Sequence, residues 1–148
     1  MRRVRAAAAA ISIALSVGAQ ASTPFTGRFL GTGRACYGTL SVQPKTVSWL
    51  TTFSQCPALP ANLIEQENAG GSVRRTYRFT RGSSSCRFEV LSLSHDDSKD
   101  SDIGWQVVGY PTEASFPQDK AGGFFTQSPD IMACYLTRDP AKNVQGHR

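Results

Sequence analysis

Residues 36–53 read CYGTLSVQPKTVSWLTTF, and this stretch indicates the fold more clearly than any other part of the chain. Small or polar residues alternate with apolar ones at 36–42, and residues 46–53 are rich in β-branched and aromatic side chains, a pattern typical of two β-strands. Between them Gln43, Pro44 and Lys45 suit a turn, because proline has a fixed φ and needs no N–H partner. The stretch therefore predicts a β-hairpin.

Further short strands are predicted on both sides of this hairpin. They cover residues 25–32, 63–67, 73–80, 86–93, 105–110 and 131–137. Polar or Pro- and Gly-containing loops at 94–104 and 111–123 separate the later strands. Seven or eight short strands joined by turns are typical of an antiparallel all-β domain. We therefore predict a small up-and-down barrel, with a β-sandwich as the alternative. The best helix candidate is 59–67, where Ala61, Leu63 and Ile64 would share a face.

The four cysteines are even in number and lie far apart: Cys36, Cys56, Cys86 and Cys134. No two have the spacing of zinc ligands, so we expect two disulfides, no metal and no cofactor. In a meander all four lie at one end of the barrel. This placement favours Cys56–Cys86 with Cys36–Cys134, and the alternative pairing is Cys36–Cys56 with Cys86–Cys134.

The first 21 residues have the three parts of a secretion signal. Arg2, Arg3 and Arg5 precede an apolar stretch at 6–17, and Ala19 and Ala21 provide a small-x-small cleavage site. We expect residues 1–21 to be removed, leaving a single barrel domain at 22–139 and a flexible polar tail at 140–148. The predicted location is the periplasm or the medium, without membrane insertion after cleavage. An uncleaved anchor is the alternative.

The formal net charge of +5 comes largely from this leader. The chain has 16 basic and 11 acidic residues, and loss of the three leader arginines leaves 13 basic residues and a net charge of +2. So small a charge provides no general attraction to phosphate. We therefore predict no nucleic-acid partner.

An arginine-rich segment is the best candidate for a polar partner site. Guanidinium groups bind phosphates, carboxylates and acidic protein surfaces. The alternative is a solvated sheet face on which arginines pair across strands with glutamates. The candidate residues are Arg74, Arg78, Arg81 and Arg87, and the candidate pairing partners are Glu65, Glu67 and Glu89.

Trp49 and Trp105 lead a large aromatic set. In a small barrel such side chains fill the interior. Alternatively, they line a cavity for a small apolar ligand.

Catalytic signals are sparse. His95 adjoins Asp96 and Asp97, so it offers a base for a small hydrolase. The alternative is a hairpin tip of solvated charges. This acidic stretch lacks the glycine and distal glutamate of a calcium loop. Glu65 and Glu67 share a strand face, but such pairs are usually only solvated. Nucleophile motifs are absent, so we predict no catalytic residue and no enzyme.

Gly31 and Gly33 begin like a dinucleotide-binding loop, but the third glycine is missing. They indicate instead a bend where strands approach closely.

The segment Thr26-Gly27-Arg28-Phe29 resembles the start of lipocalin-like (calycin) barrels, which have a glycine followed at +2 by an aromatic residue, usually Trp. The resemblance implies a closed barrel that binds a ligand or a protein, and it transfers no site residue.

These features predict an exported, disulfide-stabilised barrel that acts by binding. The leading hypothesis is an inhibitor or neutraliser of another protein in the same compartment, with the arginines and the loops at 94–104 and 111–123 as contact surfaces. The alternatives are a carrier of a small apolar ligand, with Trp49 and Trp105 near its cavity, and a small hydrolase that uses His95.

Overall fold

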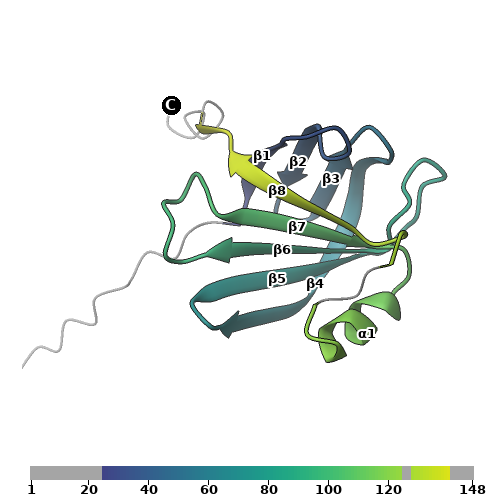
Figure 1. The fold of residues 1–148 in the computed structure, drawn as a ribbon. Helices are drawn as coiled ribbons and strands as arrows, with labels where there is room; N and C mark the ends of the chain where they lie inside the picture. Colours follow the sequence, from purple (N-terminus) through teal and green to yellow (C-terminus); the bar gives the residue numbers. More distant parts are fainter. Residues whose placement is uncertain (1–24, 125–127, 141–148) are drawn as a thin grey trace, which may run out of the picture.

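The computed structural model describes residues 25–124 and 128–140, so the predicted leader and nearly all of the predicted tail lie outside the described residues. The described chain forms a closed antiparallel barrel whose eight strands follow the order of the sequence (Figure 1). This confirms the up-and-down barrel. The strands are β1 (Gly27–Gly31), β2 (Gly38–Val42), β3 (Thr46–Leu50), β4 (Gln55–Ala69), β5 (Ser72–Phe79), β6 (Val90–Asp96), β7 (Trp105–Tyr110) and β8 (Met132–Arg138).

The predicted hairpin is the β2–β3 pair. Its strands are in register from Val42↔Val47 to Thr39↔Leu50. The N–H of Gln43 donates to the carbonyl of Thr46 across the turn, at 2.9 Å. At the other end of the meander, β1 pairs with β8, which closes the barrel.

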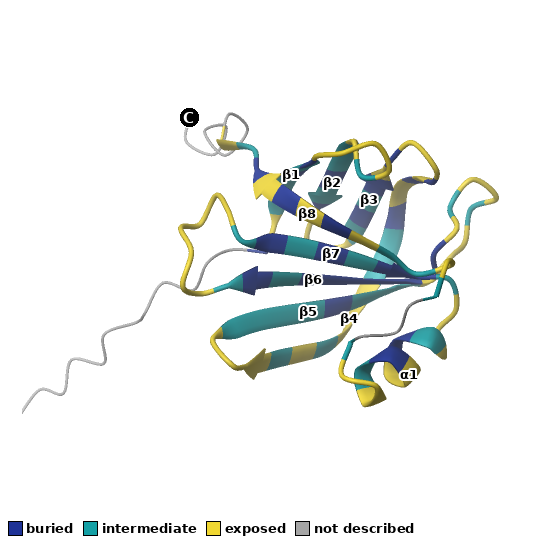
Figure 2. Cartoon of the chain, in the orientation of Figure 1, coloured by how far each residue is buried: buried dark blue, intermediate teal, exposed yellow. Residues whose placement is uncertain are grey.

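The main core lies inside the barrel because alternate strand residues point inward. Trp49, Trp105 and Phe29 are at most 1% exposed and occupy this interior. Figure 2 shows the consequence as bands of buried residues along β6 and β7. A second, smaller apolar cluster of Val90, Tyr110 and Phe116 joins the helix described below to the sheet.

Two glycines permit close approach of the backbone near the disulfides. A Cβ atom at Gly31 would lie 2.0 Å from the carbonyl oxygen of Cys36, and one at Gly38 would lie 1.8 Å from that of Leu50. No other residue fits these positions without a shift of the backbone. The prediction of a close-approach bend at 31–33 is therefore confirmed at Gly31.

Both disulfides lie at one end of the barrel, which we call the disulfide end. They join Cys36 to Cys134 and Cys56 to Cys86. This is the favoured pairing of the two, and the placement of all four cysteines at one end explains it. Two such bonds indicate that the chain folds in an oxidising compartment.

The prediction of a helix at 59–67 is wrong. These residues belong to the 15-residue strand β4, which also extends well beyond the predicted strand at 63–67. Strand β4 pairs with β5 from Ala61↔Phe79 to Ala69↔Ser72. This long ladder of backbone hydrogen bonds outweighs the weak local preference for a helix.

The prediction of a structureless loop at 111–123 is also wrong, because it contains the helix α1 (Ser115–Ala121). Phe116 packs against Val90 and Tyr110, so tertiary contact stabilises a helix too short to form alone. Pro117 lies in its first turn, where a missing N–H costs little. The strand predicted from residue 86 begins only at Val90, since the Cys56–Cys86 bond and the hydrogen bonds around it position the residues before it.

Candidate functional site

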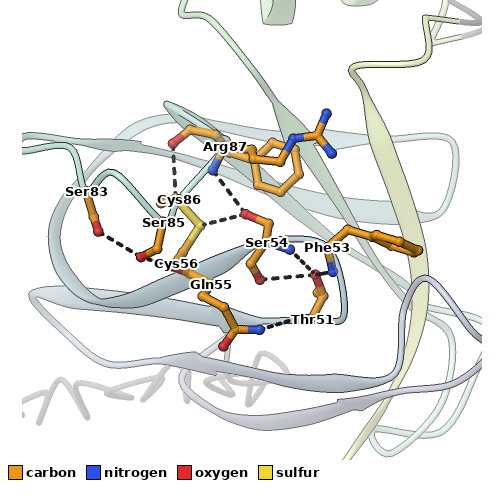
Figure 3. The surroundings of a disulfide bond; sticks show 10 residues. Thr51, Phe53, Ser54, Gln55, Cys56, Ser83, Ser85, Cys86 and Arg87 are labelled. Atoms are coloured by element: carbon orange, nitrogen blue, oxygen red, sulfur yellow. Dashed lines mark hydrogen bonds between the residues drawn. A yellow bond between two sulfur atoms is a disulfide. The ribbon is translucent and has the colours of Figure 1, made fainter.

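The disulfide end carries a tight turn at residues 51–54. The N–H of Thr51 donates to the carbonyl of Ser54 at 2.9 Å. The hydroxyl oxygen of Thr51 accepts hydrogen bonds from the N–H groups of Ser54 at 3.1 Å and Phe53 at 3.3 Å. Thr51 and Ser54 are both buried, so the base of the turn belongs to the packed part of the molecule (Figure 3).

A second set of bonds joins this turn to the segment around Cys86. The N–H of Arg87 donates to the Ser54 hydroxyl at 3.0 Å. The hydroxyl of Ser85 donates to the carbonyl of Gln55 at 2.7 Å, and the N–H of Gln55 donates back to the carbonyl of Ser85 at 2.9 Å. Together with the Cys56–Cys86 bond, these contacts hold the turn in one place.

Phe53 stands at the tip of this turn and points away from the hydrogen-bonded network (Figure 3). Phe53 is 58% exposed, and two other apolar residues at this end, Leu50 and Tyr37, are 42% and 75% exposed. The backbone of Gly38, which follows Tyr37, closely approaches the backbone of Leu50. We call Tyr37, Leu50 and Phe53 the apolar patch. Its rigid base distinguishes it from isolated exposed apolar residues, which are normal on protein surfaces.

Two arginines flank the turn through their backbones. The Thr52 hydroxyl donates to the carbonyl of Arg34 at 2.9 Å, and Arg87 is bound to Ser54 as described above. Both side chains are exposed. The guanidinium of Arg87 lies 3.8 Å from the exposed carboxylate of Asp130, a distance that gives only a weak ion pair.

The four candidate arginines lie in different surroundings. Arg74 and Arg78 project from β5, where Arg74 lies 3.8 Å from Glu67 and Arg78 lies 2.7 Å from Glu113. Arg78 and Arg81 line a common hollow, and Arg87 belongs to the disulfide end. Among the described residues, no carboxylate lies within ion-pair distance of Arg81.

Glu65 and Glu67 face helix α1. The ammonium of Lys120 lies 2.7 Å from Glu65 and 3.5 Å from Glu67. The hydrogen bond to Glu65 is the main cause that raises the pKa of Lys120 above its ordinary value. The same helix carries the buried Asp119, which accepts a hydrogen bond from the hydroxyl of Tyr110 at 2.9 Å. Burial first, and this carboxylate second, raise the pKa of Tyr110 far above its usual range.

The two candidate tryptophans lie inside the barrel. Trp49 stacks on Phe88 with ring centroids 5.2 Å apart. Trp105 contacts Phe25 edge-on at 5.1 Å and Phe29 at 4.7 Å. Both tryptophans thus occupy the packed interior, and the proposal of an apolar ligand beside them stays a prediction.

His95 also lies inside the barrel, at the end opposite the disulfides. It is 2% exposed and its ring contacts Trp105, with centroids 4.5 Å apart. Nε2 lies 3.3 Å from the carbonyl oxygen of Asp100, and Nδ1 lies 3.5 Å from a carboxylate oxygen of Asp97. The ring is therefore enclosed by protein on nearly all sides, and the hydrolase hypothesis stays a prediction.

Sequence reasoning missed the exposed turn residue Phe53 and the polar residues Ser94 and Gln106 on the outer sheet face. One signal was available for Phe53. Phe53 stands in the polar segment Thr-Thr-Phe-Ser, three residues before the half-cystine Cys56, and such surroundings indicate a turn rather than a buried strand position. No such signal was available for Ser94 and Gln106, because strand register decides which residues lie beside them.

The fold and its disulfide end define a small, disulfide-bonded eight-stranded barrel. No known protein family, curated protein or solved structure matches the chain. Within the described part of the chain, no helix has the length and apolarity that a membrane crossing requires. Across residues 25–124 and 128–140, no group of three His, Cys, Asp or Glu side chains is arranged to hold a metal ion.

Proposed function

We propose that this protein is exported to the periplasm or the medium and there binds another protein through its disulfide end, as an inhibitor or neutraliser. The observation that supports this most is the exposed Phe53 on a turn held by a disulfide and by hydrogen bonds on both sides. Aromatic side chains are the residues that most often dominate binding energy at protein interfaces.

The rigidity of the turn is an energetic argument for binding. A flexible loop loses conformational freedom on association, at a cost of about 0.5–1.5 kcal/mol for each side chain that is immobilised. The turn at 51–54 is already ordered by the hydroxyl and amide contacts of Thr51 and Ser54. Phe53 is therefore preorganised for insertion into a complementary pocket.

The charges around the turn indicate the chemistry of the partner. The backbones of Arg34 and Arg87 are bonded to the two residues on either side of Phe53, and both arginines are exposed. Their positive charge suits a partner with an apolar pocket bordered by carboxylates. Such exposed charges mainly accelerate association, so binding should weaken with rising salt concentration.

Site-specific photo-crosslinking tests this proposal. A photoreactive phenylalanine analogue at position 53 should crosslink one defined protein in the compartment that receives the barrel. The same analogue at position 63 is the control, because Leu63 is 50% exposed on β4, away from the disulfide end. Equal crosslinking at 53 and 63, or none at 53, would contradict the proposal.

A further inference from the structure

A row of four side chains crosses the outer face of the barrel over β5, β6, β7 and β8. Arg74 on β5 is opposite Ser94 on β6, Ser94 is opposite Gln106 on β7, and Gln106 is opposite Tyr135 on β8. Adjacent strands lie about 4.8 Å apart, so the row extends for about 14 Å across the sheet that faces the viewer in Figure 1.

Among the residues that the structure describes, the hydrogen bonding of this row differs from that of the row beside it. In the neighbouring row, the hydroxyls of Thr76 and Ser92 are buried and bond to each other at 3.1 Å. By contrast, the hydroxyl of Ser94 and the amide of Gln106 make no hydrogen bond to any described residue. These two groups therefore offer a ligand hydrogen-bonding capacity that no described residue uses.

The guanidinium of Arg74 is held in position at one end of the row. It lies over the ring of Phe124, 3.7 Å from the ring centroid, and 3.8 Å from Glu67. Phe124 itself has a φ of 63°, which side chains of its kind rarely adopt, and its N–H donates to the carbonyl of Asp119. Phe124, three residues beyond the end of α1, thus helps to position the guanidinium of Arg74.

The surface above the row is hollowed. A hollow of about 450 Å³ extends from Arg74 across Ser94 and Gln106 to Tyr135. A smaller one of about 100 Å³ shares the first three residues and reaches under α1. The larger volume lies within the range of about 300–1,000 Å³ that is usual for small-molecule sites.

We call the larger hollow the groove, and the side chains around it favour one class of ligand. Positive charges at Arg74 and Lys99 are matched by negative charges at Glu67 and Asp96, so the groove does not favour a polyanion. The amide, hydroxyl and guanidinium groups each hydrogen-bond to hydroxyl-rich molecules. The ring of Tyr135 is 75% exposed and offers an apolar face beside them.

We propose that this groove binds a short neutral oligosaccharide, with one sugar ring stacked on Tyr135 and its hydroxyls bonded to Gln106, Ser94 and Arg74. The site lies on the outer face over β5–β8, and none of its four residues belongs to the turn that carries Phe53. One barrel thus carries a glycan site and a protein-binding end.

Titration of the ¹⁵N-labelled protein with cellotriose, chitotriose and maltotriose, followed by NMR, tests the proposal. At least one trisaccharide should shift the side-chain amide signals of Gln106 and the backbone amide of Tyr135. Tyr135→Ala should weaken that binding about tenfold, whereas Tyr135→Phe should retain it because the ring remains. Phe53→Ala is the matched control and should bind as the unmodified protein does.

Three results would overturn the proposal. They are no response at Gln106 and Tyr135 to any of the three sugars at millimolar concentration, equal binding by Tyr135→Ala, or equal losses in Tyr135→Ala and Phe53→Ala. A native circular-dichroism spectrum for each variant separates these results from failure to fold. The outcome leaves the protein-binding proposal untouched, since that proposal is tested at residue 53.

Discussion

At the scale of single residues, the hydroxyl of Ser54 connects the exposed turn to the segment on the other side of the disulfide. It accepts the N–H of Arg87 at 3.0 Å and lies 3.6 Å from the sulfur of Cys56. Ser54 is only 3% exposed, but Arg87 is exposed, so the hydrogen bond between them is half-buried. Its loss should therefore cost about as much as the loss of an average hydrogen bond.

We therefore expect Ser54→Ala to lower the free energy of unfolding by about 0.5–1.5 kcal/mol, because the Arg87 N–H loses its acceptor. Urea denaturation measures the loss. Ser101→Ala removes an exposed hydroxyl and is the control, with an expected change within about 0.5 kcal/mol. Equal stability of the two variants would show that the Ser54 contact does not brace the turn.

A different result is expected at Phe53, whose side chain we propose contributes to recognition rather than to packing. Phe53→Ala should change the free energy of unfolding by no more than about 0.5 kcal/mol, since the ring is more than half exposed. Thermal or chemical denaturation provides the measurement. A loss of several kcal/mol would mean that the ring supports the fold and is not held ready for a partner.

At the scale of elements, helix α1 is attached to the barrel by a few specific contacts. Lys120 reaches Glu65 and Glu67 on β4, Tyr110 on β7 bonds to Asp119, and Phe116 packs beneath. None of these pairs is visible as a sequence pattern, because the partners lie many residues apart. The hairpin at 36–53 was predictable for the opposite reason, since its two strands and turn are adjacent in the chain.

The attachment of α1 should depend on pH. The pKa of Lys120 is raised in the folded protein, so its ion pair stabilises fully below the ordinary lysine pKa of about 10.4 and is lost as the pH rises through the raised value. Lys120→Met should cost about 0.2–1 kcal/mol near neutral pH. This cost, measured by urea denaturation, should shrink at about pH 11. Exposed Lys45, changed to Met, should show neither effect.

The two disulfides should differ in their contributions. Cys36–Cys134 spans 98 residues and Cys56–Cys86 spans 30. Restriction of the unfolded chain predicts stabilisation of about 4.7 and about 3.6 kcal/mol respectively. Paired Cys→Ser variants, compared by denaturation, should show the larger loss for Cys36–Cys134. The reverse order would mean that local packing around Cys56 outweighs chain entropy.

At the scale of the whole molecule, the closed barrel followed from the number and spacing of the strands, and a meander in turn favoured the observed disulfide pairing. The location of the site did not follow, because it depends on register. Whether Ser94 meets Arg74 and Gln106 is decided by strand pairing over β5–β7, and a shift of one residue would turn all three inward. The exposed Phe53 likewise depends on where β3 ends.

The proposed export predicts the mass of the secreted chain. After secretion, the intact mass should correspond to a chain that begins at Ser22, and it should lack the four hydrogens that two disulfides remove. Mass spectrometry before and after reduction provides both numbers. A chain that retains residues 1–21 would instead support the uncleaved anchor.

The affinity of the barrel for the protein that crosslinks at position 53 is the most direct measure of its role. Calorimetric titration with that purified protein should give binding that Phe53→Ala weakens by at least about 2 kcal/mol, or roughly thirtyfold, as for a residue that dominates an interface. Leu63→Ala should bind as tightly as the unmodified chain. Equal affinities for all three proteins would contradict the assignment of the disulfide end as the binding surface.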